Sequence, residues 1–293
     1  MGKLTYYLIY PLLWLISILP FPLFYLLSDF VYFLVYYLIG YRKEVVKSNL
    51  KLCFPNKTAK ELKRIEKAFY HHMCDMFLEM VKTLTISEKQ LKKRFVYKNV
   101  EEFRRFEENS PGVIVMCGHY ASYEWATAIN YYDTKNKGYA IYKKLKNEYF
   151  DQLIKDIRAN LGTTLINSKE VIPTMLQNKR DSEKASYYMI SDQSPKRSKI
   201  KAWTNFMGVE TPVFTGSEAM AKKLDFAVLY LKVEKVKRGF YEATFSPLAE
   251  NPKEFENFKI TEAFFTKLEE QIKNQPEYYL WTHKRWKFNK KDF

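Results

Sequence analysis

Hydrophobic and polar residues divide the chain into an uncharged N-terminal stretch and a longer region of short alternating patterns. Leu4 to Ser28 and Phe30 to Tyr41 hold no charged residue, and only Asp29 separates them. This stretch exceeds the roughly 20 residues that cross a bilayer core about 30 Å thick. Three prolines interrupt it, so the pattern predicts either a kinked membrane span or paired helices that are re-entrant or lie in the interface. A buried core helix is the alternative interpretation.

Basic residues follow the uncharged stretch directly, at Arg42, Lys43 and Lys47. The positive-inside rule assigns such a flank to the cytoplasmic side of a membrane. The stretch lacks the short apolar core with a small-residue cleavage site that marks a removed signal peptide. We therefore expect residues 1–41 to anchor the chain and residues 42–293 to form a domain on the cytoplasmic side.

The domain begins with a helical lead-in, expected over residues 42–110. Thr58 and Glu61 have the spacing of a capping box. Apolar residues then recur at helical intervals, which predicts an amphipathic helix of about 25 residues. These positions are Leu62, Ile65, Phe69, Met73, Met76 and Met80. Ser87 has the form of an N-cap for a second, short helix.

Beyond residue 110 short apolar runs alternate with helical patterns, which predicts an α/β domain with a largely parallel sheet. The first run, Val113 to Cys117, is β-branched and too short for a helix, as in a strand buried on both faces. Further strands are expected at Gly138–Tyr142, Thr163–Asn167, Ala185–Ser191, Ala227–Val233 and Tyr241–Phe245. Helices are expected at Tyr123–Tyr132, Glu148–Asn160, Glu170–Gln177 and Thr261–Lys273, and an aromatic loop at Trp203–Gly208 feeds another helix.

A histidine and a glutamate, His119 and Glu124, follow the first buried strand. On one continuous helix, positions five apart lie roughly 140° apart around the axis and could not face one another. They meet if His119 lies in the strand-to-helix turn and Glu124 in the first turns of the helix. The carboxylate would then orient the imidazole and leave its other nitrogen as a general base. The spacing equally allows a histidine that caps the helix or lies in the core.

Other polar residues follow predicted strands, where ligands bind in open α/β sheets. The candidates for substrate contact are Lys143, Arg158, Asp192, Gln193 and Arg197. For each of them a solvated charge or polar group is the alternative. Phe206, in the aromatic loop, is a candidate for lining an apolar pocket.

Composition narrows the function classes. The formal net charge of +15 predicts an anionic partner, for which nucleic acid, acidic lipid headgroups and an acidic carrier protein are the candidates. Aromatic and basic residues mixed over 278–287 fit either a membrane edge or a nucleic-acid strip. Three cysteines without metal-type spacing suggest a reducing compartment, and four histidines without an HExxH pattern give no zinc motif.

Two rival interpretations remain open at this point. In the first, Cys117 is a nucleophile beside His119, as in a thioesterase or a covalent acyl-enzyme, because residues two apart on a strand share a face. A cysteine that ends an apolar strand is more often a buried, inert thiol. In the second, the chain is a membrane-tethered protein that binds an anionic ligand without catalysis.

Several motifs, in order, resemble the bacterial lipid A biosynthesis acyltransferases, the lauroyl/myristoyl transferase family. They are Tyr41-Arg42-Lys43, Asn49-Leu50, Phe54-Pro55, Gly118-His119-Tyr120 with Glu124-Trp125, Ser191-Asp192-Gln193, Asn205-Phe206-Met207-Gly208 and Leu280 to Lys287. The resemblance covers nearly the whole chain. It departs from the family at Ala121-Ser122, where many members carry Gly-Asn.

The resemblance implies a glycerolipid-acyltransferase-like mixed sheet flanked by helices, with an N-terminal membrane anchor. It implies transfer of a fatty acyl chain from acyl carrier protein, or acyl-CoA, to a hydroxyl of a lipid A precursor or related glycolipid. Acylation of an aminolipid or another lipid by the same chemistry is the alternative. His119 and Glu124 are then catalytic, and backbone N–H groups near Gly118 and Tyr120, or Arg158, are candidates for binding the oxyanion. No metal, cofactor or nucleic acid is expected, and the location implied is the bacterial inner membrane, cytoplasmic side.

Overall fold

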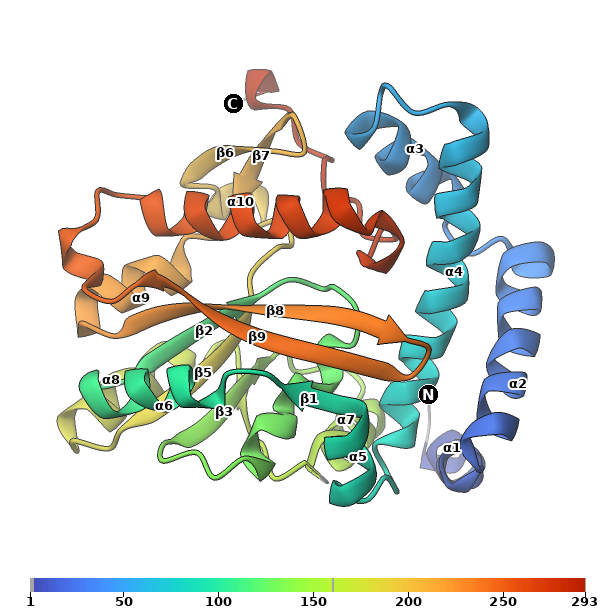
Figure 1. Cartoon of the computed structure of the whole chain (residues 1–293), viewed down its shortest axis with the longest axis horizontal. Helices are drawn as coiled ribbons and strands as arrows, with labels where there is room; N and C mark the ends of the chain where they lie inside the picture. The colour runs from blue at the N-terminus through green and yellow to red at the C-terminus, as the bar shows by residue number, and fades with distance from the viewer. Residues whose placement is uncertain (1–2, 160, 293) are drawn as a thin grey trace.

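The structure, a computed structural model, describes residues 3–159 and 161–292 and centres on a seven-stranded sheet (Figure 1). The strand order is β1-β9-β8-β2-β5-β3-β4. These strands are β1 Phe95–Tyr97, β2 Val113–Cys117, β3 Lys137–Tyr142, β4 Thr164–Asn167, β5 Ala185–Ile190, β8 Ala227–Lys237 and β9 Phe240–Ala249. Every pair of neighbours is parallel except β8 with β9. The predicted α/β class with a mixed sheet is confirmed.

Helices flank this sheet, as predicted. Their bounds are α3 Lys43–Cys53, α4 Ala59–Lys82, α5 Glu88–Arg94, α6 Val100–Asn109, α7 Glu148–Ala159, α8 Val171–Arg180, α9 Gly216–Leu224 and α10 Lys259–Asn274. The predicted helix after β2 is present as the 3₁₀ helix η2, Tyr123–Tyr131. Asn160, the predicted last residue of α7, lies outside the described residues. The lead-in is mostly helical but also contains the edge strand β1, which the helical prediction missed.

Strand β2 is the buried middle of the sheet. Both neighbours, β5 and β8, run parallel to it, and all five residues are buried. A run such as Val113-Ile114-Val115 suits this place because apolar side chains fill both faces, each contributing about 1.5–3 kcal/mol when fully buried. Because β2 is buried and paired on both sides, the backbone at its carboxyl end, where His119 follows, is held in a defined position.

Helix α4 confirms the predicted amphipathic helix and its start. The Thr58 hydroxyl accepts from the backbone N–H of Glu61 at 3.3 Å, and the Glu61 carboxylate accepts from the N–H of Thr58 at 2.8 Å. Met73 and Met76 are buried against the rest of the domain. The capping box thus sets where α4 begins, and the apolar face of α4 sets which side of the helix is buried.

The aromatic loop predicted at Trp203–Gly208 is wrong, because this segment forms a hairpin of β6 (Ala202–Phe206) and β7 (Val209–Val213). Met207 and Gly208 make its two-residue turn with φ values of 57° and 79°. Positive φ at both positions is the geometry that matches the twist of a two-stranded ribbon. The hairpin fully buries Phe206, whose ring centroid lies 5.0 Å from that of Phe265.

The uncharged N-terminal stretch forms two helices and a π-helical end, α1 (Lys3–Ile18), α2 (Phe21–Phe33) and η1 (Leu34–Ile39). Pro20 separates α1 from α2. One stretch, Phe21–Ile39, is long and apolar enough to cross a membrane, by length and composition. Helix α2 lies on the side of α4 that faces away from the sheet (Figure 1).

Candidate active site

The sheet brings His119 and Asp192 together. His119 follows β2 and Asp192 follows β5, and these strands are parallel neighbours with Cys117 opposite Ile190. The carboxyl ends of parallel neighbours meet at one edge of the sheet. His119 Nδ1 lies 2.6 Å from Asp192 Oδ1, so the two side chains share a short hydrogen bond.

The environment makes this histidine more basic. Burial by itself lowers the pKa of His119, but the charge and hydrogen bond of Asp192 outweigh it, so the pKa is raised above the ordinary imidazole value. Asp192 is buried, and desolvation by itself raises its pKa. The charge and hydrogen bonds of His119 lower the pKa by more than this, so the net pKa of Asp192 is depressed. Asp192 therefore remains a carboxylate that accepts from Nδ1–H of the imidazole.

The second imidazole nitrogen faces an amide. Gln193 Nε2 lies 3.2 Å from His119 Nε2. With Nδ1–H held by Asp192, Nε2 carries the lone pair and accepts from the Gln193 side chain. This is the tautomer that a general base requires, and a hydroxyl that replaced the amide would lie within reach of Nε2.

Glu124 contacts Arg158 instead of His119, which differs from the predicted His119–Glu124 contact. Its carboxylate oxygens accept from Arg158 Nε at 3.0 Å and from Nη2 at 2.7 Å, a bidentate pair between η2 and α7. The 3₁₀ helix directs Glu124 toward α7, while Asp192 occupies the Nδ1 side of the imidazole. The charge of Glu124 still adds to that of Asp192 in raising the pKa of His119, whereas Arg158 lowers it.

Glu124→Gln should lower the pKa of His119, because the nearby negative charge is removed while Arg158 remains. If His119 acts as a base, the acidic limb of the pH–rate profile then moves to lower pH, and initial rates measured across that limb test this. Glu148→Gln, an exposed glutamate at the start of α7, is the matched control. A profile identical to that of the unchanged protein would show that Glu124 does not influence the imidazole.

The C-terminal segment holds the His119 loop from the other side. The backbone N–H of Leu280 donates to the His119 carbonyl at 3.1 Å, and that of Ala121 donates to the Tyr278 carbonyl at 2.9 Å. Ala121 has a φ of 49°. These contacts tie a turn near residue 120 to a segment about 160 residues later in the chain, so the imidazole is fixed by tertiary packing.

The same segment fixes the loop after Asp192. Ser194 donates its backbone N–H to His283 Nε2 at 3.4 Å and its hydroxyl to the Arg285 carbonyl at 2.7 Å. Burial lowers the pKa of His283 to about 4, so this imidazole is neutral and remains an acceptor. Arg285 is almost fully buried and donates from Nη1 to the Pro212 carbonyl at 2.8 Å. His283 and Arg285 of the C-terminal motif therefore hold the loop that carries Asp192 and Gln193.

Comparison with known proteins decides the family. The family model for bacterial lipid A biosynthesis acyltransferase matches residues 2–288. The chain belongs to this family. It is 22% identical over 279 residues to the lipid A biosynthesis lauroyltransferase of Escherichia coli (strain K12), covering 94% of this chain and 89% of that one.

Two further relatives show the same extent of similarity. The lipid A biosynthesis palmitoleoyltransferase of Escherichia coli (strain K12) and the lipid A biosynthesis acyltransferase of Shigella flexneri are each 22% identical over 281 residues. Each alignment covers 94% of this chain and 88% of the relative. The resemblance predicted from the motifs is confirmed, and the protein is an acyltransferase.

The N–H of Tyr120, one of the oxyanion donors predicted for this acyltransferase, is already used within the protein, and so is that of the neighbouring Ala121. The Tyr120 N–H donates to the Gly118 carbonyl at 2.8 Å, and the Ala121 N–H donates to Tyr278. The Tyr120 hydroxyl points into the domain and donates to the Gln275 carbonyl at 2.8 Å. The predicted role of Tyr120 therefore requires the turn to rearrange, because its N–H bond closes a tight local turn.

Cys117 of the acyltransferase is buried at the end of β2. Burial, followed by the charges of Asp192 and Glu124, raises the pKa of its thiol to about 12. The reactive form of cysteine is the thiolate, so the environment opposes a nucleophilic role. Among residues 3–159 and 161–292, no group of three His, Cys, Asp or Glu side chains could hold a metal ion.

The remaining predicted substrate residues of the acyltransferase lie in two settings. Lys143, on the loop after β3, and Arg197, at the start of the 3₁₀ helix Arg197–Lys199 after β5, are both exposed. They follow the carboxyl ends of strands parallel to β2, the strand before His119, and substrate contact there stays a prediction. Phe206 is fully buried and packs in the core, which differs from the predicted pocket lining. Arg285, grouped with the basic residues of the C-terminal motif, is likewise buried.

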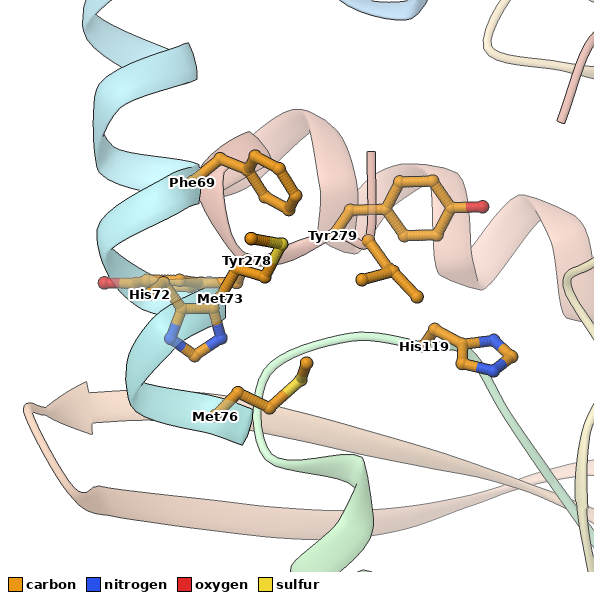
Figure 2. A pocket seen from close by; sticks show the side chains of 8 residues that line it. Phe69, His72, Met73, Met76, His119, Tyr278 and Tyr279 are labelled. Atoms are coloured by element: carbon orange, nitrogen blue, oxygen red, sulfur yellow. The ribbon is translucent and has the colours of Figure 1, made fainter. Parts of the chain in front are cut away.

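Figure 2 shows the side chains of this acyltransferase that pack against the backbone of the loop carrying His119. Side chains of α4 and the C-terminal segment meet the backbone side of His119, and the imidazole points away from Met73 and Met76. The full set is Phe69, His72, Met73, Met76, Tyr278, Tyr279 and Leu280. Met73 and Met76 of the predicted amphipathic helix thus pack against the loop and leave the ring directed toward Asp192 and Gln193.

Sequence reasoning missed two features of this site. It did not pair His119 with Asp192, although both follow predicted strands, because the order of strands in the sheet has no local signature. It also missed Tyr123, whose ring lies edge-on to His119 with centroids 5.0 Å apart. An aromatic four residues after a histidine gives no signal of this contact.

Proposed function

We propose that this acyltransferase moves a fatty acyl chain from acyl carrier protein, or from acyl-CoA, to a hydroxyl of a lipid A precursor or related glycolipid. His119 is the general base. The hydrogen-bonded series Asp192–His119–Gln193 at the edge of the sheet carries this proposal. The acyl groups named in the relatives, lauroyl and palmitoleoyl, support a fatty acyl substrate.

The reaction proceeds by direct transfer. The acceptor hydroxyl takes the place of the Gln193 amide at Nε2 of His119, which removes the hydroxyl proton as the oxygen attacks the thioester carbonyl. The carbon–sulfur bond then breaks, and the imidazolium returns its proton to the leaving thiolate. Asp192 stabilises the imidazolium, and general base catalysis of this kind contributes about 10²- to 10⁴-fold.

The basic surface suits an acidic donor and a phosphorylated acceptor. Exposed cations on loops after β3 and β5 and near the C-terminus form a rim, which comprises Lys143, Lys144, Lys196, Arg197 and Lys284. Positive potential on such a rim speeds the encounter with a negatively charged carrier protein or lipid headgroup. This accounts for a net charge of +15 without invoking nucleic acid.

In this proposal residues 1–41 attach the enzyme to the bacterial inner membrane and residues 42–293 form the catalytic domain on the cytoplasmic side. The exposed apolar surface of α1, α2 and η1 supports the attachment. Arg42 and Lys43 directly after this region support the cytoplasmic side. The three cysteines are free and buried, as suits a reducing compartment.

The function is tested by incubating the purified protein with acyl carrier protein carrying a labelled fatty acyl chain, together with bacterial lipid extract. We expect label in the lipid fraction, released by mild alkali as an ester, and acyl-CoA in a parallel reaction compares the donors. Label found as an ester of an aminolipid would instead support that alternative acceptor. Binding of carrier or lipid without transfer would support a non-catalytic membrane-tethered protein and overturn the proposal.

A further inference from the structure

One side of the stretch Phe21–Ile39 is exposed and apolar along its whole length. Its side chains recur every three or four residues, so they lie on one face of the helix. These are Leu23, Leu26, Phe30, Phe33 and Tyr37, each about half exposed or more. Helix α1 adds Leu8, Leu12, Leu15 and Ile18. We call this set of nine residues the apolar stripe.

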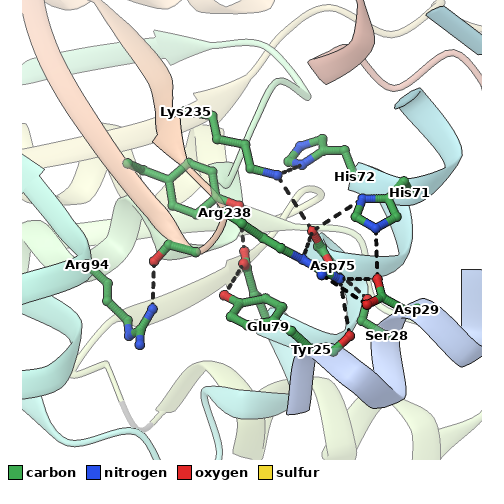
Figure 3. Close-up of polar contacts among 12 residues, drawn as sticks. Tyr25, Ser28, Asp29, His71, His72, Asp75, Glu79, Arg94, Lys235 and Arg238 are labelled. Carbon is green, nitrogen blue, oxygen red and sulfur yellow. Dashed lines mark hydrogen bonds and ion pairs between the residues drawn. The ribbon is translucent and has the colours of Figure 1, made fainter. Parts of the chain in front are cut away.

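Helix α2 is joined to the catalytic domain by a group of charged and polar residues, the polar clamp, made of Ser28, Asp29, Asp75 and Arg238 (Figure 3). Ser28 is buried on the side of α2 opposite the apolar stripe, and Asp29 lies at the border of that stripe with its side chain 45% exposed. Asp29 accepts from Arg238 Nη2 at 2.6 Å, and Arg238 also donates to the fully buried Asp75 at 2.7 Å. The Ser28 hydroxyl donates to Asp75 at 2.7 Å. The clamp therefore links the middle of α2 to α4 and to the turn between β8 and β9.

Charged groups of the catalytic domain also contact both ends of the stretch. At the start, the Arg94 guanidinium lies 3.2 Å from the ring centroid of Phe21. Near the end, Lys43 Nζ lies 4.1 Å from the ring centroid of Tyr36, and the Tyr36 hydroxyl donates to Glu66 at 3.1 Å. At 1.5 Å per residue, Phe21 to Tyr36 is about 22 Å, most of the thickness of a hydrocarbon core.

From these contacts we infer that α1, α2 and η1 lie in the plane of one leaflet, with the apolar stripe inserted into it, and do not cross the bilayer. The inference rests on the proposed membrane attachment and adds its geometry. A crossing helix would either carry Asp29 away from Arg238 or take Arg238 and Asp75 into the hydrocarbon. Placing a charge at the bilayer centre is costly, and leaving a buried charge unpaired is costlier still.

The partner is thus the surface of a lipid leaflet that carries anionic headgroups. The apolar Val236 and Lys237, both exposed at the end of β8, directly precede the clamp residue Arg238. Apolar side chains beside exposed cations are the combination that binds an anionic membrane surface. The catalytic domain then stays on the leaflet where a lipid acceptor is found.

The experiment measures how deeply three positions of the stripe lie in a membrane. Leu23→Cys, Phe30→Cys and Tyr37→Cys, each with the three native cysteines replaced by alanine, receive a nitroxide label and bind vesicles of phosphatidylethanolamine and phosphatidylglycerol. An in-plane helix gives three depths within about 5 Å of one another. A crossing helix places Phe30 deepest and the other two about 10 Å nearer to opposite surfaces. Lys60→Cys, exposed on α4, is the control that remains in water.

Each other outcome has a defined meaning. A deep Phe30 between two shallow positions overturns the in-plane geometry, while acyl transfer measured in the same vesicles tells whether the proposed function survives. Labels that remain in water overturn the membrane attachment together with the inference. Labels already shielded before vesicles are added, in a dimer detected by light scattering, would assign the stripe to a second copy and also overturn it.

Discussion

Replacing His119 by alanine is expected to lower the rate of acyl transfer by about 10²- to 10⁴-fold. The imidazole is the group whose Nε2 faces the place proposed for the acceptor hydroxyl, and its Nδ1 is fixed by Asp192 at 2.6 Å. Without it, the hydroxyl keeps its proton during attack on the thioester. Single-turnover transfer of a labelled acyl chain from acyl carrier protein to lipid measures the loss at the chemical step.

The matched control for this result is Cys117→Ala, two residues earlier on the same strand end. Its thiol has a pKa raised to about 12 by burial, so we expect transfer close to that of the unchanged protein. The thermal unfolding midpoint of both variants shows whether the domain stays folded. Near-normal transfer by His119→Ala would rule out the base mechanism, and loss of transfer in a folded Cys117→Ala protein would support the covalent acyl-enzyme instead.

Asp192→Asn is expected to reduce transfer by about 10²- to 10⁴-fold and to change its pH dependence. Asparagine cannot stabilise the imidazolium, and its amide can donate to Nδ1 and favour the tautomer with a proton on Nε2. Asp192 raises the pKa of His119, and the base must be neutral, so activity falls as the pH drops through this raised pKa. In the variant the pKa is lower, and the acidic limb of the remaining activity moves to lower pH.

Complete pH–rate profiles of the two proteins test this, with Asp181→Asn, an exposed aspartate after α8, as the control. The shift of the limb separates a role in positioning the base from a general loss of folding, which would lower the rate without moving the limb. An unchanged limb together with an unchanged plateau would mean that Asp192 does not act on His119.

Asp192→Asn and Glu124→Gln together distinguish the roles of the two carboxylates near His119. Glu124 follows His119 by five residues and is part of the motif, yet it is paired with Arg158 by two hydrogen bonds. Asp192 lies 73 positions after His119 in the sequence and contacts its imidazole directly. We therefore expect the larger loss from Asp192→Asn and the smaller shift from Glu124→Gln.

Much of the architecture followed from local patterns. The buried strand at Val113–Cys117, the capping box at Thr58 and the alternation of strands and helices each rest on neighbours in the chain, so sequence periodicity and capping chemistry were enough. The hairpin of β6 and β7 was missed because its two-residue turn needs positive φ at both positions, and methionine, unlike glycine or asparagine, does not predict positive φ at position 207. The edge strand β1 is only three residues long, too short for a period to appear.

The sequence by itself determined the family motifs, the position of His119 after a buried strand, and a membrane-length apolar N-terminus. Only the tertiary structure decided which carboxylate holds the imidazole, because Asp192 reaches His119 through the pairing of β2 with β5. It also decided that Phe206 and Arg285 are buried, and that Asp29 faces Arg238. Local patterns record which residues follow one another, whereas these contacts depend on strand order and packing between segments far apart in the chain.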